Sequence, residues 1–144
     1  MAKPLYSTNC FNTLIRVAED CPAQRGEEPQ LRGGQPTVAV LQFRMIAGAP
    51  YKYTSDDVVF ATSSAGRALD AKAAKKARNA ARETFFSRGQ ACMRASPLGK
   101  RFGWGVHADG EGRIALYAVD SKRYQALARD PEVAQTRAMR SKRA

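Results

Sequence analysis

Residues 100–117, KRFGWGVHADGEGRIALY, contain the only tryptophan and the only histidine of the chain and predict a β-hairpin. Two registers compete. A two-residue turn at Gly110–Glu111 would mix polar and apolar partners on both faces. A three-residue loop ending at Gly112 places that glycine where a left-handed backbone is needed, and it separates the two faces cleanly. We therefore expect the three-residue loop, with Trp104, Val106 and Ala108 opposite Ala118, Leu116 and Ile114.

The other face of this hairpin carries glycine at alternate positions beside polar side chains. A glycine inside a strand packs nothing, so it marks a close approach by another part of the chain, a ligand or a partner protein. Packing within the chain is the reading we favour. On the same face His107 is a candidate general base or phosphate contact, although a lone histidine is more often structural. A small-molecule or enzymatic site here would combine His107, Tyr117 and Arg113, joined by Asp56 or Cys92.

The chain before the hairpin predicts both strands and helices. Residues 11–17 alternate in polarity and predict a strand, whereas residues 19–36 predict an exposed loop. Residues 37–50 favour a helix, and the expected buried face consists of Val38, Leu41 and Met45. The short apolar runs at 57–63 and 91–96 predict further strands.

Two short helices are expected after the hairpin. The hydroxyl of Ser121 can cap a helix that runs through Leu127, and the sequence Asp-Pro-Glu at 130–132 can open another. The whole pattern indicates an α+β fold with a mainly antiparallel sheet and helices packed on one face. We expect residues 1–136 to form a single domain and residues 137–144 to form a basic C-terminal tail.

Positive charge is concentrated in two places. The chain has 24 basic and 13 acidic residues, a net charge of +11. Residues 65–88 carry seven basic and two acidic side chains, a net of +5, and residues 137–144 carry four basic side chains and no acidic one. Residues 65–84 predict a helix with an alanine stripe on one side and cations on the other. The candidate anion-binding residues are Lys72, Lys75, Lys76, Arg78, Arg82, Arg140, Lys142 and Arg143.

This charge predicts an anionic partner, most plausibly nucleic acid. The competing interpretation is that the basic face only keeps the protein in solution. A protein-interaction subunit, with the glycine face of the hairpin receiving its partner, is a third hypothesis.

Other candidate chemistry is sparse. The adjacent carboxylates Asp56 and Asp57 could bind a metal or share acid–base work, but a turn or helix cap is the better reading. Cys92 could be a nucleophile if Arg94 and His107 lay nearby, although a small buried side chain is the commoner role. Three cysteines without metal-ligand spacing predict no zinc site, no disulfide framework and a reducing cytoplasm. No membrane span and no cofactor site is expected.

Several strings together resemble a family of short bacterial proteins classed as a conserved domain of unknown function. They are VAEDCP, PYKYTSDDVVF, FFSRGQACMRASPLGKRFGWGVH, GRIALYAVDS and AMRSKRA, which span nearly the whole chain. The resemblance implies a free-standing bacterial protein in which the basic C-terminal residues are part of the family's own sequence. It implies no activity.

Overall fold

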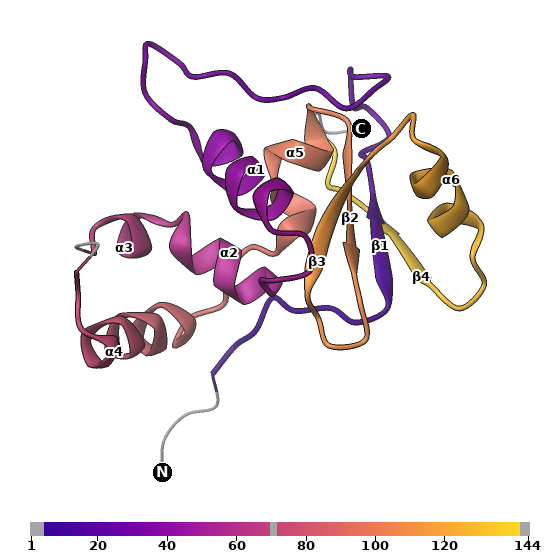
Figure 1. Ribbon diagram of the computed structural model, residues 1–144. Helices are drawn as coiled ribbons and strands as arrows, with labels where there is room; N and C mark the ends of the chain where they lie inside the picture. Colours follow the sequence, from indigo (N-terminus) through magenta and orange to yellow (C-terminus); the bar gives the residue numbers. More distant parts are fainter. Residues whose placement is uncertain (1–4, 70–71, 142–144) are drawn as a thin grey trace.

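The computed structural model describes residues 5–69 and 72–141 and is built around one sheet (Figure 1). The strands are β1 (Thr13–Arg16), β2 (Trp104–Ala108), β3 (Ile114–Ala118) and β4 (Ala134–Arg137), in the order β3-β2-β1-β4. β2 pairs antiparallel with both β1 and β3, and β4 lies parallel to β1. The predicted α+β class with a mainly antiparallel sheet is confirmed.

The hairpin has the predicted register. Ala108 pairs with Ile114, and the backbone N–H of Asp109 donates to the carbonyl of Arg113 at 2.9 Å. Gly112 has φ +81°, the left-handed conformation that the three-residue loop requires. Val106 and Ile114 are each 1% exposed, so the expected apolar face of the hairpin is buried.

Helix α1 (Val38–Gly48) covers this apolar face, but only in part through the predicted side chains. Met45 packs against the core, but Val38 is 39% exposed, whereas Ala39, Gln42 and Ile46 are buried. The buried face therefore differs from the predicted one and includes the polar residue Gln42. Its amide carbonyl accepts from the Ser96 hydroxyl at 2.6 Å, and this bond compensates the burial of the polar group.

The short helix α5 (Pro97–Lys100) joins α1 over the same face. The core beneath them includes Ile15, Ile46, Val58, Met93, Leu98, Val106 and Ile114, with Trp104 and Leu116 partly buried at its margin. Phe86 is also buried, but it lies outside this cluster and packs its ring edge-on against Phe85.

One helix covers the other face of the sheet, so the prediction that all helices share one face is wrong in that respect (Figure 1). Helix α6 (Lys122–Arg129) begins at Ser121, whose hydroxyl accepts from the backbone N–H of Tyr124 as predicted. The Tyr124 ring lies directly over Gly105, where an added Cβ would come within 2.5 Å of it. Gly105 therefore makes room for the Tyr124 ring, and this ring occupies the space that a ligand or partner protein would need.

Two predicted strands are helical instead. Residues 57–63 overlap α2 (Ser55–Ala61), which starts with a capping box formed by Thr54 and Asp57. The box satisfies free N–H groups of the first turn, so it outweighs the strand preference of the valines. Residues 91–96 contain a single 3₁₀ turn, η1 (Met93–Ala95).

The predicted short helix at 130–132 is a turn. The Asp130 carboxylate accepts from the backbone N–H of Glu132 at 2.9 Å, and the chain then enters β4. The expected domain boundary at residue 136 falls inside this strand. Ala138 is 3% exposed and the N–H of Met139 donates to the carbonyl of Arg94, so residues just beyond the boundary pack on the fold.

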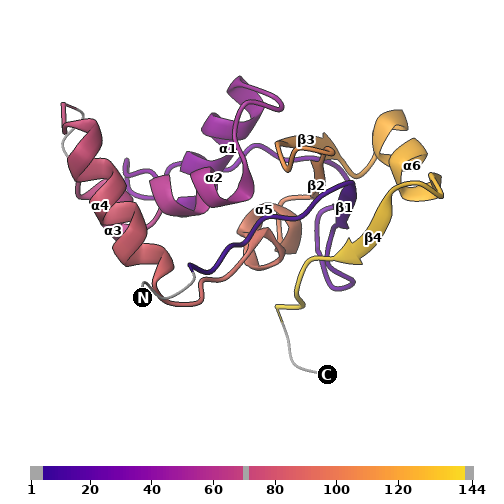
Figure 2. The same ribbon diagram turned by 90° about the horizontal axis from the view of Figure 1, so that it is seen from below.

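The predicted helix 65–84 is broken. Its described parts form α3 (Ser64–Arg67) and α4 (Lys75–Phe86), which lie at the opposite end of the molecule from α6 (Figure 2). Ala77 and Ala80 are exposed, so the alanine stripe does not pack as expected. Alanine buries too little apolar area to hold the helix, and the aromatic end at Phe85 and Phe86 anchors it.

Candidate functional site

The predicted basic residues lie at two separate places. Lys72 is exposed in the turn before α4, and Lys75, Lys76 and Arg78 are exposed on the first turns of that helix. Ala74 precedes the helix and offers no side-chain cap, and the first turn contains no acidic residue. The N–H groups of the first turn and the two lysines thus give this helix end positive charge.

Of the expected anion-binding residues near the C-terminus, the structure describes Arg140 alone. The Arg140 guanidinium lies 3.9 Å from the Glu19 carboxylate. Lys142 and Arg143 lie outside the described residues. The described part of the candidate anion site is therefore α4 with its surroundings.

A cleft of about 570 Å³ runs between α4, α2 and α3. Cations and apolar groups line it together: Met45, Lys52, Tyr53, Asp57, Phe60, Ala61, Gly66, Arg78, Asn79 and Arg82. A second hollow, of about 460 Å³, shares Asn79 and Arg82 with the first and continues to Leu5 and Tyr6. We call the two hollows together the α4 groove.

Aromatic rings stand at both ends of the α4 groove. The Lys52 ammonium lies 5.2 Å from the centroid of the Tyr53 ring, a cation–π distance. Tyr6 is 59% exposed at the other end, where its backbone N–H donates to the carbonyl of Phe86. Sequence reasoning missed Tyr6, Lys52 and Tyr53 as site residues. The alternation of tyrosine and lysine in PYKYTSDD was the signal that could have identified two of them.

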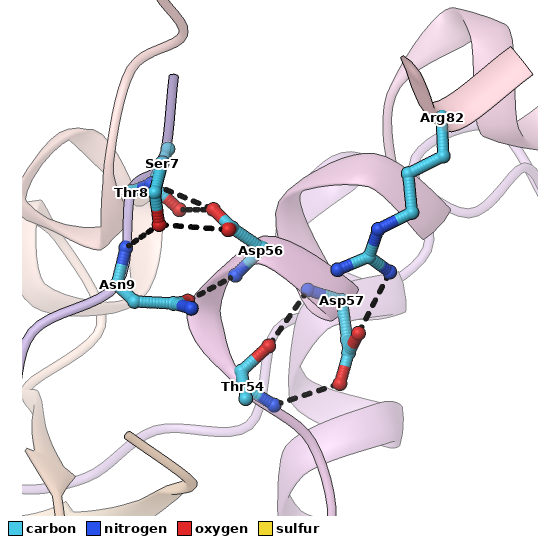
Figure 3. A network of polar contacts seen from close by, with 7 residues as sticks. All are labelled: Ser7, Thr8, Asn9, Thr54, Asp56, Asp57 and Arg82. Carbon is cyan, nitrogen blue, oxygen red and sulfur yellow. Dashed lines mark hydrogen bonds and ion pairs between the residues drawn. The ribbon is translucent and has the colours of Figure 1, made fainter. Parts of the chain in front are cut away.

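Arg82 is held in the middle of the α4 groove by an ion pair (Figure 3). Its guanidinium donates to the Asp57 carboxylate at 2.7 Å, which also accepts from the backbone N–H of Thr54 at 3.0 Å. Burial of Asp57 tends to raise its pKa, but the hydrogen bonds from Thr54 and Arg82 outweigh burial and lower it. Asp57 is therefore an anion at neutral pH that orients Arg82 and neutralises part of its charge.

The neighbouring Asp56 points away from Asp57 and is fully engaged (Figure 3). Its carboxylate accepts from the Ser7 hydroxyl at 2.8 Å and from the Thr8 backbone N–H and hydroxyl at 2.6 and 2.8 Å. The carboxylate thus fastens the N-terminal segment to α2. Asp57 caps the start of α2, as predicted, whereas Asp56 binds the N-terminal segment. Among the described residues no group of three or more acidic, histidine or cysteine side chains could hold a metal.

His107 belongs to a hydrogen-bonded cluster on the α6 face of the sheet. The Tyr51 hydroxyl lies 2.7 Å from His107 Nδ1 and 2.9 Å from the Tyr117 hydroxyl. Tyr51 adopts φ +58°, a strained conformation for a residue other than glycine, and its backbone N–H donates to the carbonyl of Ile114. The structure thus joins His107 to Tyr117 as expected, through a Tyr51 that no sequence signal indicated. Arg113 instead lies 3.6 Å from Glu111 in the loop.

The pKa directions keep His107 and Tyr51 uncharged at neutral pH. Burial, followed by the positive charge of Arg123, lowers the pKa of His107 below its ordinary value of 6.5. Burial and the bond with Tyr117 raise the pKa of Tyr51. The polar atoms of the cluster are directed at one another rather than at a ligand space.

Cys92 lies in a third environment. It lines a hollow of about 260 Å³ with Cys10 and Arg94, beside Ile15 of β1. Ile15 pairs with Val106, and His107 is the next residue along β2, so the His107 side chain points to the opposite face of the sheet. The suggested catalytic grouping of His107, Cys92 and Asp56 is therefore not formed: Arg94 is near Cys92, and His107 is not.

Comparisons with known proteins identify the family of the chain. Within residues 5–69 and 72–141, none of the helices has the length and apolar character needed to cross a bilayer. No curated protein and no solved structure matches the chain. The model of one family, described as a family of unknown function (DUF6157), matches residues 5–144, which is nearly the whole chain. By this match the protein belongs to the DUF6157 family.

Proposed function

We propose that the protein binds single-stranded nucleic acid along the α4 groove. The observation that carries the proposal is the shared lining of this groove, where guanidinium and ammonium groups stand beside the half-buried ring of Tyr53 and the exposed ring of Tyr6. Single-strand binding needs both parts, because cations follow the phosphates while rings stack on unpaired bases.

The cations are arranged along the length that a strand would follow. Lys75 and Lys76 stand at the uncapped start of α4, Arg78 lines the first hollow, and Arg82 lies between the two hollows. Two lysines at the positive end of a helix dipole are unfavourable in the free protein. A phosphate at this end would relieve that repulsion and could accept from backbone N–H groups of the first turn.

The rings favour a single strand over a duplex. Tyr53 and Tyr6 lie at opposite ends of the groove, with Asn79 and Arg82 between them. Bases in a duplex are stacked on one another and cannot reach side chains in a cleft, whereas unpaired bases can. Asn79 adds an amide that can donate to or accept from a base edge.

The cluster around His107 supports a small-molecule function less well. Its hydroxyls and imidazole nitrogen bond to each other and line neither the α4 groove nor the hollow at Cys92, whereas Arg78 and Arg82 line a hollow of about 570 Å³. The groove therefore carries the proposal.

Fluorescence anisotropy over a salt series tests the proposal. The probes are single-stranded RNA, single-stranded DNA and duplex DNA, each of about 16 nucleotides or base pairs, the upper end of known site sizes. With about four to six phosphate contacts, affinity for a single strand should fall roughly 50- to 300-fold between 50 and 200 mM salt. Replacing Lys75, Lys76 and Arg78 with glutamine should reduce the slope of log K against log salt by about 2.

The matched control removes the same charge from the other end of the molecule. Lys122, Arg123 and Arg129 are exposed on α6, and their replacement with glutamine should leave most of the slope intact. Tyr6→Leu keeps an apolar side chain but removes the ring, and it should weaken single-strand binding by about 1–3 kcal/mol. Binding weaker than about 0.1 mM for all three probes at low salt would refute the proposal. Equal loss in the α4 and α6 variants would also refute it, because net charge alone would then explain binding.

A further inference from the structure

Two cysteines that are 82 positions apart in the sequence line the same small hollow. Cys10 follows the N-terminal segment that Asp56 fastens to α2, and Cys92 directly precedes η1. The hollow has a volume of about 260 Å³, and both side chains are half-buried and border it. The fold therefore brings these two distant cysteines to the same hollow.

The charge on Cys92 also affects the pKa of Cys10. Burial raises the pKa of the Cys10 thiol, and the negative charge of a Cys92 thiolate raises it further. Arg94 borders the same hollow and places a positive charge beside it.

We propose that Cys10 and Cys92 form a redox pair that closes to a disulfide within the chain when the protein meets a hydroperoxide. Neither cysteine lines the α4 groove or belongs to the His107 cluster, although the cysteine hollow and the second hollow of the groove share Ser7. Three cysteines without recognised spacing predicted no disulfide framework, and a reversible bond that forms only on oxidation is consistent with that expectation.

The reaction balances with hydrogen peroxide as the only oxidant. The Cys92 thiolate attacks one peroxide oxygen, the O–O bond breaks, and hydroxide leaves and takes up a proton as water. Cys92 is then a sulfenic acid. The Cys10 sulfur attacks the Cys92 sulfur, the S–O bond breaks, and the departing hydroxide takes the Cys10 proton as a second water. Two thiols have been oxidised to one disulfide, and one peroxide has been reduced to two waters.

The assignment of roles follows from the surroundings of the two sulfurs. Cys10 stays protonated because burial and its neighbour's charge hold its pKa up, which suits the resolving thiol. Cys92 then makes the first attack. Cys21 is a natural control because it is also half-buried, with its thiol 3.8 Å from the carbonyl of Ala23 in another part of the chain.

Thiol counting and peptide mapping on the full chain test the pair. Treatment of the folded protein with hydrogen peroxide should lower the count of titratable thiols from three to one, and dithiothreitol should restore it. Trypsin digestion under non-reducing conditions should release the peptide 89–94 linked to the peptide that ends at Arg16. Cys21→Ser should fall from two thiols to none under the same treatment.

The single variants separate the steps. Cys10→Ser should accumulate a sulfenic acid at residue 92 that dimedone traps, whereas Cys92→Ser should keep both of its remaining thiols. The proposal is overturned if the linked peptides contain Cys21, if the bond joins two chains, or if peroxide leaves three thiols in the folded protein. The peptide map needs only the unaltered chain, so it decides the matter even if a variant fails to fold. Loss of nucleic-acid binding does not affect these readouts.

Discussion

Replacing Gly105 with alanine tests how α6 is held on the sheet. The added Cβ would lie 2.5 and 2.7 Å from two carbons of the Tyr124 ring. Carbon atoms in favourable contact are about 3.5–4.0 Å apart, so the ring would have to move by about 1 Å. Tyr124 is 6% exposed, and its hydroxyl accepts from the backbone N–H of Val17 at 3.1 Å. The ring is therefore held at both ends and cannot give way freely.

The expected cost combines three effects. Overpacking of this kind costs about 1–3 kcal/mol. Weakening the bond between Val17 and Tyr124 adds about 0.5–1.5 kcal/mol. Alanine recovers roughly 0.5–1 kcal/mol of the entropy that glycine loses in a strand. The free energy of unfolding should therefore fall by about 2 kcal/mol, a loss of roughly 4–8 °C in Tm for a chain of this size.

Urea unfolding followed by the fluorescence of the single tryptophan, Trp104, measures this change. Gly110→Ala is the matched control, because its Cβ would meet only the Asn12 side chain at 3.6 Å, an ordinary contact. It should change stability by less than about 0.5 kcal/mol. The double variant Gly105→Ala/Tyr124→Leu should show a favourable coupling, since removing the ring removes the clash. Stability of Gly105→Ala within about 0.5 kcal/mol of the parent would show that the ring does not pack there as described.

Two further predictions concern pH. Because burial and Arg123 lower the pKa of His107 in the folded protein, the unfolded chain binds that proton more tightly. The stability associated with His107 should be complete above its ordinary pKa of 6.5 and should decline as pH falls below it; His107→Gln should lack this component in urea titrations. Asp57 also has a lowered pKa in the fold, despite burial, because Thr54 and Arg82 donate to its carboxylate. The contribution of Asp57 to the free energy of unfolding should persist as pH falls to 3.8, the ordinary pKa of the carboxyl, and should be lost below it. If Asp57→Asn loses stability in acid to the same extent as the parent, the result contradicts the ion pair with Arg82.

Local signals in the sequence were sufficient for the hairpin and for α6. The loop at 110–112 demands a left-handed glycine, and the alternation of apolar residues admits one register without mixing faces. The hydroxyl of Ser121 likewise satisfies an N–H three residues away. These features depend on backbone conformation within a few residues, so they could be predicted. The cap at Thr54 is a local feature of the same kind. The valines after it nevertheless predict a strand, because a single helical turn of apolar residues shows no clear helical period.

The packing of helices depended on partners that the sequence does not reveal. Gln42 is buried because Ser96, far along the chain, satisfies its amide, and this rotates α1 away from its apparent apolar side. The alanine stripe of α4 predicts a helix packed along one side. Alanine buries little apolar surface, however, and the helix is held by the aromatic residues at its C-terminal end. Similarly, the turn at 130–132 leads into β4 because β1 offers free backbone groups to pair with.

The candidate sites also contain one part that the sequence predicts and other parts that only the tertiary structure brings together. Composition and helical period were enough to identify α4 as the basic element, since charge is a property of the residues alone. The rings beside it, the Tyr51–His107–Tyr117 cluster and the Cys10–Cys92 hollow were all decided by tertiary structure. Each joins segments separated by more than 50 residues in at least one contact. Such neighbours are set by the crossing of the chain that inserts β1 between the hairpin and β4, and no local propensity records that crossing.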